Sequence, residues 1–263
     1  MTTAAPPTAS TDVDLSGVTV RFASRRVRTT ALEDVSLRVG RGEFVTVVGP
    51  SGCGKSTLLK VIAGLIRPSG GEVSLLGRPV TGPRDDVGFV FQRAALLDWR
   101  GVRRNILLQA EMRGMDRTAA ATRADALIAL TGLTGFEKAL PHELSGGMQQ
   151  RVALCRALLH EPPVLLMDEP FGALDALTRE QMNDELHRVC AEAGTTVVLV
   201  THSIAEAVFL GNRVAVLSPR PGRVVETFDV DLPARREYAR TMSDERFERL
   251  AARIRALLVG GQP

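Results

Sequence analysis

Lysine is scarce in this chain of 263 residues. Only three of its 33 lysines and arginines are lysines, namely Lys55, Lys60 and Lys138. Lysine places a compact, strongly hydrated charge on a flexible stem, so arginine is not a simple substitute for it. A lysine kept in such an arginine-rich chain therefore indicates a position that uses the compact ammonium.

Cysteine and excess charge are also lacking. The three cysteines, Cys53, Cys155 and Cys190, are widely spaced and odd in number, which excludes a disulfide framework and fits no metal-binding pattern. They are typical of a reducing cytosol. The formal net charge of +3 is too small an excess to indicate a nucleic-acid partner.

Long apolar runs are missing as well. No run approaches the roughly 20 residues that span a bilayer, so we expect any link to a membrane to come through a partner. The N-terminal segment MTTAAPPTASTDVD has neither the positive region nor the apolar region of a signal peptide. We expect residues 1–13 to form a flexible tail.

The chain does contain the apolar content of a globular protein, at 44% hydrophobic residues. Short apolar runs alternate with helical patterns, which predicts an α/β fold with a parallel sheet. Strands are expected at 18–22, 35–39, 44–48, 73–76, 87–91, 164–167, 196–200, 214–217 and 223–230. Helices are expected after residue 57, at 147–160 and 177–193, after residue 203 and over the last 20 residues.

A glycine-rich loop follows the predicted strand 44–48. Its sequence, GPSGCGKST, matches the phosphate-loop pattern between a strand and a helix. Glycines let backbone N–H groups surround a phosphate, and the helix N-terminus favours the same anion. In such loops Lys55 would bridge the β- and γ-phosphates, and the Ser56 hydroxyl would ligate Mg²⁺. The loop residues predicted to bind nucleotide are Gly49, Pro50, Ser51, Gly52, Cys53, Gly54, Lys55, Ser56 and Thr57.

Cys53 within this loop has two interpretations. It is either a small residue that fits the packing, or a reactive thiol activated by Lys55 and the helix N-terminus. The second interpretation predicts that ATP protects Cys53 from alkylation.

Two carboxylates follow the apolar strand in the segment VLLMDEP, residues 164–170. Asp168 is placed to hold Mg²⁺ through water, as the second half of a phosphate-loop site. Glu169 is placed to orient or deprotonate the attacking water. The alternative is an acidic pair that caps a helix.

The segment LSGGMQQR, residues 144–151, resembles the signature motif of ABC ATPases. By itself, Ser-Gly-Gly before a helix could be only an N-cap. Here the segment lies between the phosphate loop and the acidic strand, and the chain is identified as a member of the ABC ATPase family. The resemblance implies a P-loop NTPase (RecA-like) α/β fold: a parallel-sheet core, an antiparallel β subdomain and an inserted α-helical subdomain at about 93–160. The ATPase domain is expected at 14–225, with a mainly helical C-terminal extension at 226–263.

The family's functional residues are carried over by motif. Phe22 matches the aromatic residue that stacks on adenine, although a core Phe in a strand remains the alternative. Gln92 resembles the glutamine that touches Mg²⁺ and the attacking water. His202 resembles the histidine at the γ-phosphate, against a structural histidine as the alternative. Asp175 resembles the aspartate that crosses the dimer.

These matches define three groups of predicted site residues. The catalytic group is Lys55, Gln92, Glu169 and His202, and the Mg²⁺ group is Ser56, Gln92 and Asp168. The signature residues that would contact the ATP of a partner subunit are Leu144, Ser145, Gly146, Gly147, Met148 and Gln149.

The resemblance also implies partners. ATP and Mg²⁺ are the expected cofactors, and a second ATPase subunit is expected in a homodimer. We expect transmembrane permease subunits to contact the surface near Gln92 and residues 96–99, with a separate solute-binding protein in the complex. Trp99 is either part of this docking surface or a buried core residue.

The resemblance is to ATPases of the nitrate, sulfonate and taurine importer branch, although Asp98 stands where that branch normally has Pro. It implies an ATPase that energises import from the cytoplasmic side of the cell membrane, as a peripheral subunit. The alternative is a soluble ABC ATPase with non-membrane partners, for example in iron–sulfur cluster assembly.

Overall fold

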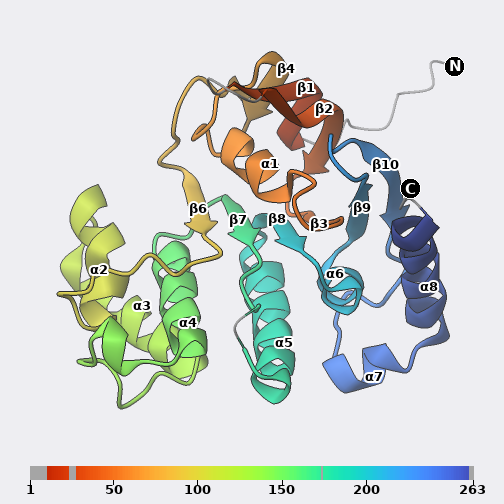
Figure 1. The fold of residues 1–263 in the computed structure, drawn as a ribbon. Coiled ribbons are helices and arrows are strands. Elements are labelled where there is room, and N and C mark those ends of the chain that lie inside the picture. Colours follow the sequence, from red (N-terminus) through yellow and green to blue (C-terminus); the bar gives the residue numbers. More distant parts are fainter. Residues whose placement is uncertain (1–10, 24–27, 173, 261–263) are drawn as a thin grey trace, which may run out of the picture.

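The structure, a computed structural model, describes residues 11–23, 28–172 and 174–260. Residues 1–10 of the expected tail lie outside the described residues. Two β-sheets occupy the upper part of the molecule in Figure 1, and most of the helices lie below them.

The first sheet is antiparallel and has the order β2-β1-β4-β5. Its strands are β1 (Thr11–Ala23), β2 (Arg28–Gly40), β4 (Gly70–Leu75) and β5 (Arg78–Pro79). β1 and β2 are much longer than predicted, because register shifts interrupt the apolar alternation that marks a strand in the sequence. Residues 11–13, expected in the tail, belong to β1.

The second sheet has the order β10-β9-β3-β8-β7-β6. Its strands are β3 (Phe44–Val48), β6 (Val87–Val90), β7 (Val164–Asp168), β8 (Thr196–Thr201), β9 (Arg213–Leu217) and β10 (Val224–Asp229). All pairs are parallel except β9 with β10. The expected boundary between the ATPase domain and the C-terminal extension, after residue 225, falls inside β10.

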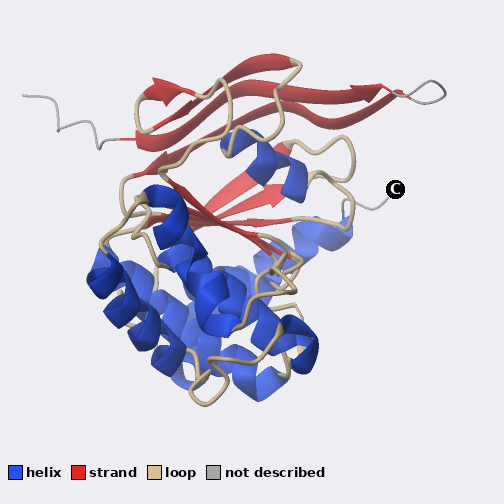
Figure 2. Cartoon of the chain, turned by 90° about the vertical axis from the view of Figure 1, so that its left-hand side faces the viewer, coloured by secondary structure: helices blue, strands red, loops and turns tan. Residues whose placement is uncertain are grey.

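The second sheet is buried on both faces, which explains its continuous apolar runs. In β3, Val45 and Val47 face the core between the two sheets, whereas Phe44 and Val48 face the helices on the other side. Helix α1 (Lys55–Ile62) lies between the two sheets (Figure 2). The phosphate loop therefore joins a central strand to a central helix.

The remaining helices cover the other face and one side. Between β6 and β7 the chain forms α2 (Val102–Arg113), α3 (Arg117–Leu130), the short 3-10 helix η1 (Pro141–Glu143) and α4 (Gly146–Leu158). α5 (Ala176–Ala193), α6 (Ile204–Leu210), α7 (Tyr238–Met242) and α8 (Glu245–Gly260) follow later in the chain. In Figure 1, α2, α3 and α4 lie on one side of α5, and α7 and α8 lie on the other. None of the helices in the described part of the chain has the length and apolar content to span a membrane.

This topology brings the predicted site residues to one edge. β3, β8 and β7 are neighbouring parallel strands, so their carboxyl ends meet at the same edge of the sheet. That edge is where ligands bind in open α/β sheets.

Candidate functional site

The phosphate loop leaves β3 at Gly49 and ends in α1. Gly52 and Gly54 have φ angles of 74° and 111°, in the region that favours glycine. A Cβ on Gly54 would also stand 2.7 Å from the carbonyl oxygen of Ala31. The loop can therefore fold tightly against β2 only with glycine at this position.

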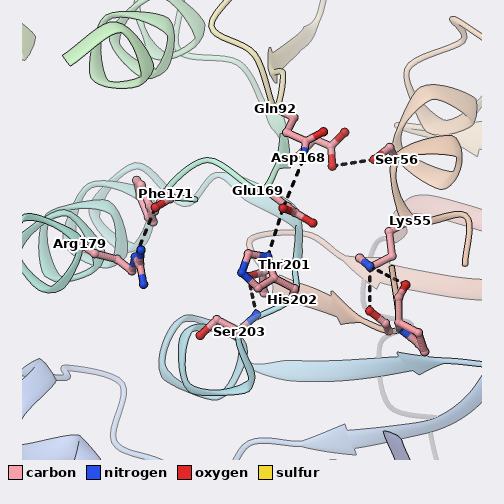
Figure 3. A network of polar contacts seen from close by, with 12 residues as sticks. Lys55, Ser56, Gln92, Asp168, Glu169, Phe171, Arg179, Thr201, His202 and Ser203 are labelled. Carbon is pink, nitrogen blue, oxygen red and sulfur yellow. Dashed lines mark hydrogen bonds and ion pairs between the residues drawn. The ribbon is translucent and has the colours of Figure 1, made fainter. Parts of the chain in front are cut away.

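Lys55 is the first residue of α1, and its side chain folds back into the loop. The residue is only 6% exposed. Its Nζ donates hydrogen bonds to the carbonyl oxygens of Gly49 at 2.8 Å and Pro50 at 3.0 Å (Figure 3). The first N–H groups of the helix have no intrahelical acceptor, so the ammonium and the helix N-terminus together favour an anion.

Ser56 and Asp168 connect the loop to the end of β7. The Ser56 hydroxyl donates to Asp168 Oδ1 at 2.9 Å, although the residues are far apart in the chain. Asp168 is only 4% exposed. Burial raises its pKa above the ordinary value, and the hydrogen bond from Ser56 opposes this increase. A cation beside this carboxylate would relieve the cost of its desolvation.

Glu169 follows directly in a strained backbone conformation. Its φ of 48° is uncommon for a residue other than glycine, and its N–H is fixed to the carbonyl oxygen of Val200 at 2.9 Å. Its Oε2 lies 3.1 Å from Nδ1 of His202 and accepts from Nε2 of Gln92 at 3.4 Å (Figure 3). Such strain is found at functional sites where surrounding contacts hold the residue in place.

Apart from the buried Asp168, these side chains line one cleft of about 710 Å³. Phe22 lies in its wall and is 45% exposed, so it is not a core residue. The complete lining is Phe22, Thr29, Ala31, Ser51, Gly52, Gly54, Lys55, Ser56, Thr57, Gln92, Glu169, His202 and Arg220. Sequence reasoning did not assign Thr29, Ala31 or Arg220. For Arg220 the signal available was its place in the segment SPRPGRV.

Cys53 is buried within the loop. It is 1% exposed, and burial raises the pKa of its thiol although Lys55 counteracts the increase. A buried neutral thiol is a poor nucleophile, so the structure favours the packing interpretation over the reactive one.

The signature segment forms the start of α4, away from the lining of this cleft. Ser145 caps the helix and accepts from Met148 N at 3.2 Å. Asp175 likewise caps α5 and accepts from Thr178 N at 3.0 Å. Gln150, which sequence reasoning missed, donates from Nε2 to the carbonyl oxygen of Phe91 at 2.8 Å. This bond ties the signature helix to the residue before Gln92.

The segment after Gln92 presents an exposed aromatic residue. Trp99 is 75% exposed, so it is not part of the core. The buried Asn105 holds the segment: its side chain accepts from Leu97 N at 2.8 Å and donates to the Arg100 carbonyl oxygen at 2.6 Å. Arg156 of α4 donates to the carbonyl oxygens of Ala94 and Ala95. Trp99 is therefore displayed on a loop anchored on two sides.

Comparison with known proteins decides the family. The sequence model described as "ABC transporter" matches residues 32–172. The chain belongs to the ABC transporter family. Among its relatives, the taurine import ATP-binding protein TauB of Burkholderia thailandensis is 50% identical over 234 residues, which cover 88% of this chain and 90% of the relative.

Other ABC proteins agree with this placement. The aliphatic sulfonates import ATP-binding protein SsuB of Bacillus licheniformis is 49% identical over 212 residues, covering 81% of this chain and 82% of the relative. The ATP-binding cassette MJ0796, solved as a dimer in a post-hydrolysis state with ADP and Pi, superposes with a TM-score of 0.76 at 35% identity. It covers 84% of this chain and 100% of the solved chain. The predicted ABC ATPase fold is thus confirmed, and the chain is an ATP-binding ABC ATPase.

Proposed function

We propose that this chain is the ATP-hydrolysing subunit of an ABC importer for a small solute, namely nitrate, an aliphatic sulfonate, taurine or a related molecule. The observation that carries the proposal is the position of Glu169 between Gln92 and His202, at the rim of the cleft that contains Lys55. The names of the taurine and sulfonate import relatives support the solute class.

The roles proposed within the cleft are supported by the residues that line it. Adenine stacks on Phe22, and the phosphates lie in the loop from Gly49 to Thr57 with Lys55 as their cation. Glu169 orients the attacking water and accepts its proton, while His202 and Gln92 hold the Glu169 carboxylate and contact the γ-phosphate.

Ser56, Asp168 and Gln92 would hold Mg²⁺. Mg²⁺ is usually bound by one or two carboxylates together with substrate phosphates, not by a cage of protein ligands. Asp168 and Ser56 fit this mode of binding, because they place a buried carboxylate beside a hydroxyl. The described part of the chain contains no cluster of three or more His, Cys, Asp or Glu that would form a cage. When bound, Mg²⁺ neutralises charge on the β- and γ-phosphates.

The second half of each site comes from a partner subunit. Residues Leu144 to Gln149 lie outside the cleft of their own chain, so we propose that they close the cleft of a second copy in a homodimer. Asp175 lies in the segment between Glu169 and α5, where it would cross to the other subunit. The dimeric state of the related cassette supports this arrangement.

A permease docks beside Gln92. Trp99 is a large exposed aromatic residue on an anchored loop, and such residues are favoured as interface anchors. Docking there would place the ATPase on the cytoplasmic face of the membrane as a peripheral subunit, together with a separate solute-binding protein.

Uptake in cells tests the proposal. The gene is deleted, and accumulation of radiolabelled taurine, an alkanesulfonate and nitrate is measured with and without the wild-type chain. We expect the wild-type chain to restore uptake of at least one of these solutes, and Glu169→Gln to restore none. Normal uptake of all three solutes in the deletion strain would reject the solute class.

A further inference from the structure

The turn between β9 and β10, residues 218–223, lies directly against the phosphate loop. Gly222 donates from N to the Ala31 carbonyl oxygen at 2.9 Å and accepts from Glu33 N at 3.0 Å. A Cβ on Gly222 would stand only 2.2 Å from the carbonyl oxygen of Cys53. The backbone of the turn therefore touches the loop and is fixed there by β2.

The turn is also braced internally. Ser218 donates from N to the Arg223 carbonyl oxygen at 2.9 Å, and its Oγ accepts from Arg223 N at 3.0 Å. The side chain of Arg223 points to Glu33, with Nη2 at 2.6 Å from Oε2. The bonds of Ser218 and Gly222 hold the turn in one conformation before any ligand binds, which lowers the entropy lost on binding. The Arg223–Glu33 pair is solvent-exposed and adds little to this.

Arg220 extends from this turn into the cleft. Its Nε donates to the carbonyl oxygen of Gly52 at 2.9 Å, and Arg220 lines the same cleft as Phe22 and Lys55. Among the described residues, neither Nη atom of Arg220 forms a hydrogen bond or an ion pair. A guanidinium carries five N–H donors in a planar fork, so the Nη groups remain able to bind a ligand.

The charge of Arg220 acts on a residue inside the phosphate loop. Lys55 and Arg220 both act to lower the pKa of the buried Cys53 thiol, against the larger effect of burial. Lys55 holds the loop carbonyls of Gly49 and Pro50 while Arg220 holds that of Gly52. Two cations thus fix the loop carbonyls and leave the loop N–H groups for an anion.

We propose that Arg220 is a second phosphate-binding cation of the nucleotide cleft. The ligand class is a nucleoside di- or triphosphate, because the planar fork of arginine binds phosphate oxygens in a bidentate manner. The assignment rests on the proposed function, since it needs nucleotide in this cleft. Arg220 lies beyond residue 172, where the match to the family's sequence model ends.

The test compares three variants of the full-length chain. Binding of fluorescent mant-ATP, mant-ADP and mant-GTP is measured for the wild type, Arg220→Ala, Arg220→Lys and Arg223→Ala. Arg223 is the matched control, because it belongs to the same turn but pairs with Glu33 outside the cleft lining. The melting temperature of each variant checks that the turn is intact.

We expect Arg220→Ala to weaken the binding of all three nucleotides by about 10- to 150-fold, as for loss of one charge-assisted contact. The KM for ATP should rise by a similar factor, and the salt dependence of binding should become shallower. Arg220→Lys should recover part of the affinity, and Arg223→Ala should bind like the wild type.

Four results would overturn the assignment. Unchanged binding by Arg220→Ala, while the wild type binds, would reject Arg220 alone and leave the proposed function standing. An equal loss in Arg223→Ala would show that the fold of the turn is responsible. A loss for mant-ATP and mant-ADP but not for mant-GTP would place the contact on the base. A wild-type chain that binds no nucleotide would reject the proposed function and this assignment with it.

Discussion

Replacing Glu169 by glutamine isolates the proton-accepting step. The amide keeps the size of the side chain and an oxygen that can still accept from His202 and Gln92, at the positions now 3.1 Å and 3.4 Å away. It removes the negative charge and the ability to take a proton. The backbone of Glu169 has a left-handed φ of 48° and is held by the hydrogen bond from its N–H to the Val200 carbonyl oxygen. Both features belong to the backbone, so we expect the substitution to leave the fold unchanged.

The expected loss in kcat is about 100- to 10,000-fold, the usual contribution of a positioned general base. This range corresponds to about 3–5 kcal/mol of barrier height. ATP affinity should change by less than about threefold, because Glu169 does not belong to the phosphate loop. ATP should therefore accumulate at the site and hold two subunits together.

The assays are phosphate release under saturating ATP and Mg²⁺, and light scattering after size exclusion with ATP. Glu192→Gln on the outer part of α5 is the control, since its partner Arg188 is half-exposed and remote from the cleft. A Glu169→Gln variant that hydrolyses ATP within tenfold of the wild type would refute the role assigned to Glu169. A variant that stays monomeric at saturating ATP would call the dimer arrangement into question.

Three further outcomes are expected. Trp99→Ala should abolish recovery of the permease in affinity purification without lowering the melting temperature. Met112→Ala changes a residue that is also exposed but lies on α2, and it should leave recovery intact. Equal recovery in both variants would contradict the docking surface. Arg236→Met should lower the free energy of unfolding by about 2–4 kcal/mol in urea titrations, because the buried guanidinium donates to three carbonyl oxygens at the C-terminal end of α6. A loss below about 1 kcal/mol would show that these hydrogen bonds are dispensable. His187 has its pKa lowered to about 4 by burial, so the unfolded chain binds its proton first and stability is lost as the pH falls from about 6.5 to 4. His187→Gln should accordingly flatten the decline of melting temperature between pH 7 and pH 5, and a parallel decline would contradict this reasoning.

Motifs that combine a strand end with a turn could be predicted from the sequence. The expected strand 44–48 coincides with β3, because both faces of that strand are buried and its apolar run is unbroken. The order of strand, glycine loop and helix then placed Lys55 and Ser56. The pairing of Ser56 with Asp168 followed because β3, which leads into the phosphate loop, and β7, which ends at Asp168, end at the same edge of the sheet.

Features that depend on tertiary contacts could not be predicted. An aromatic residue in a strand or loop gives the same local pattern whether it is buried or exposed, so Phe22 and Trp99 kept two interpretations until their exposure was known. Arg220 reaches Gly52 across 168 positions of sequence, and no local period marks such a contact. Asn105 would be a neutral helix residue by sequence, yet it anchors the loop that presents Trp99.

The most direct test of the central claim is affinity purification of the tagged full-length chain from detergent-solubilised native membranes, followed by mass spectrometry. We expect recovery of a multi-span permease in stoichiometric amount, with a solute-binding protein encoded beside it. Recovery of soluble partners alone would contradict the role in transport, although the ATPase chemistry of the cleft would still stand.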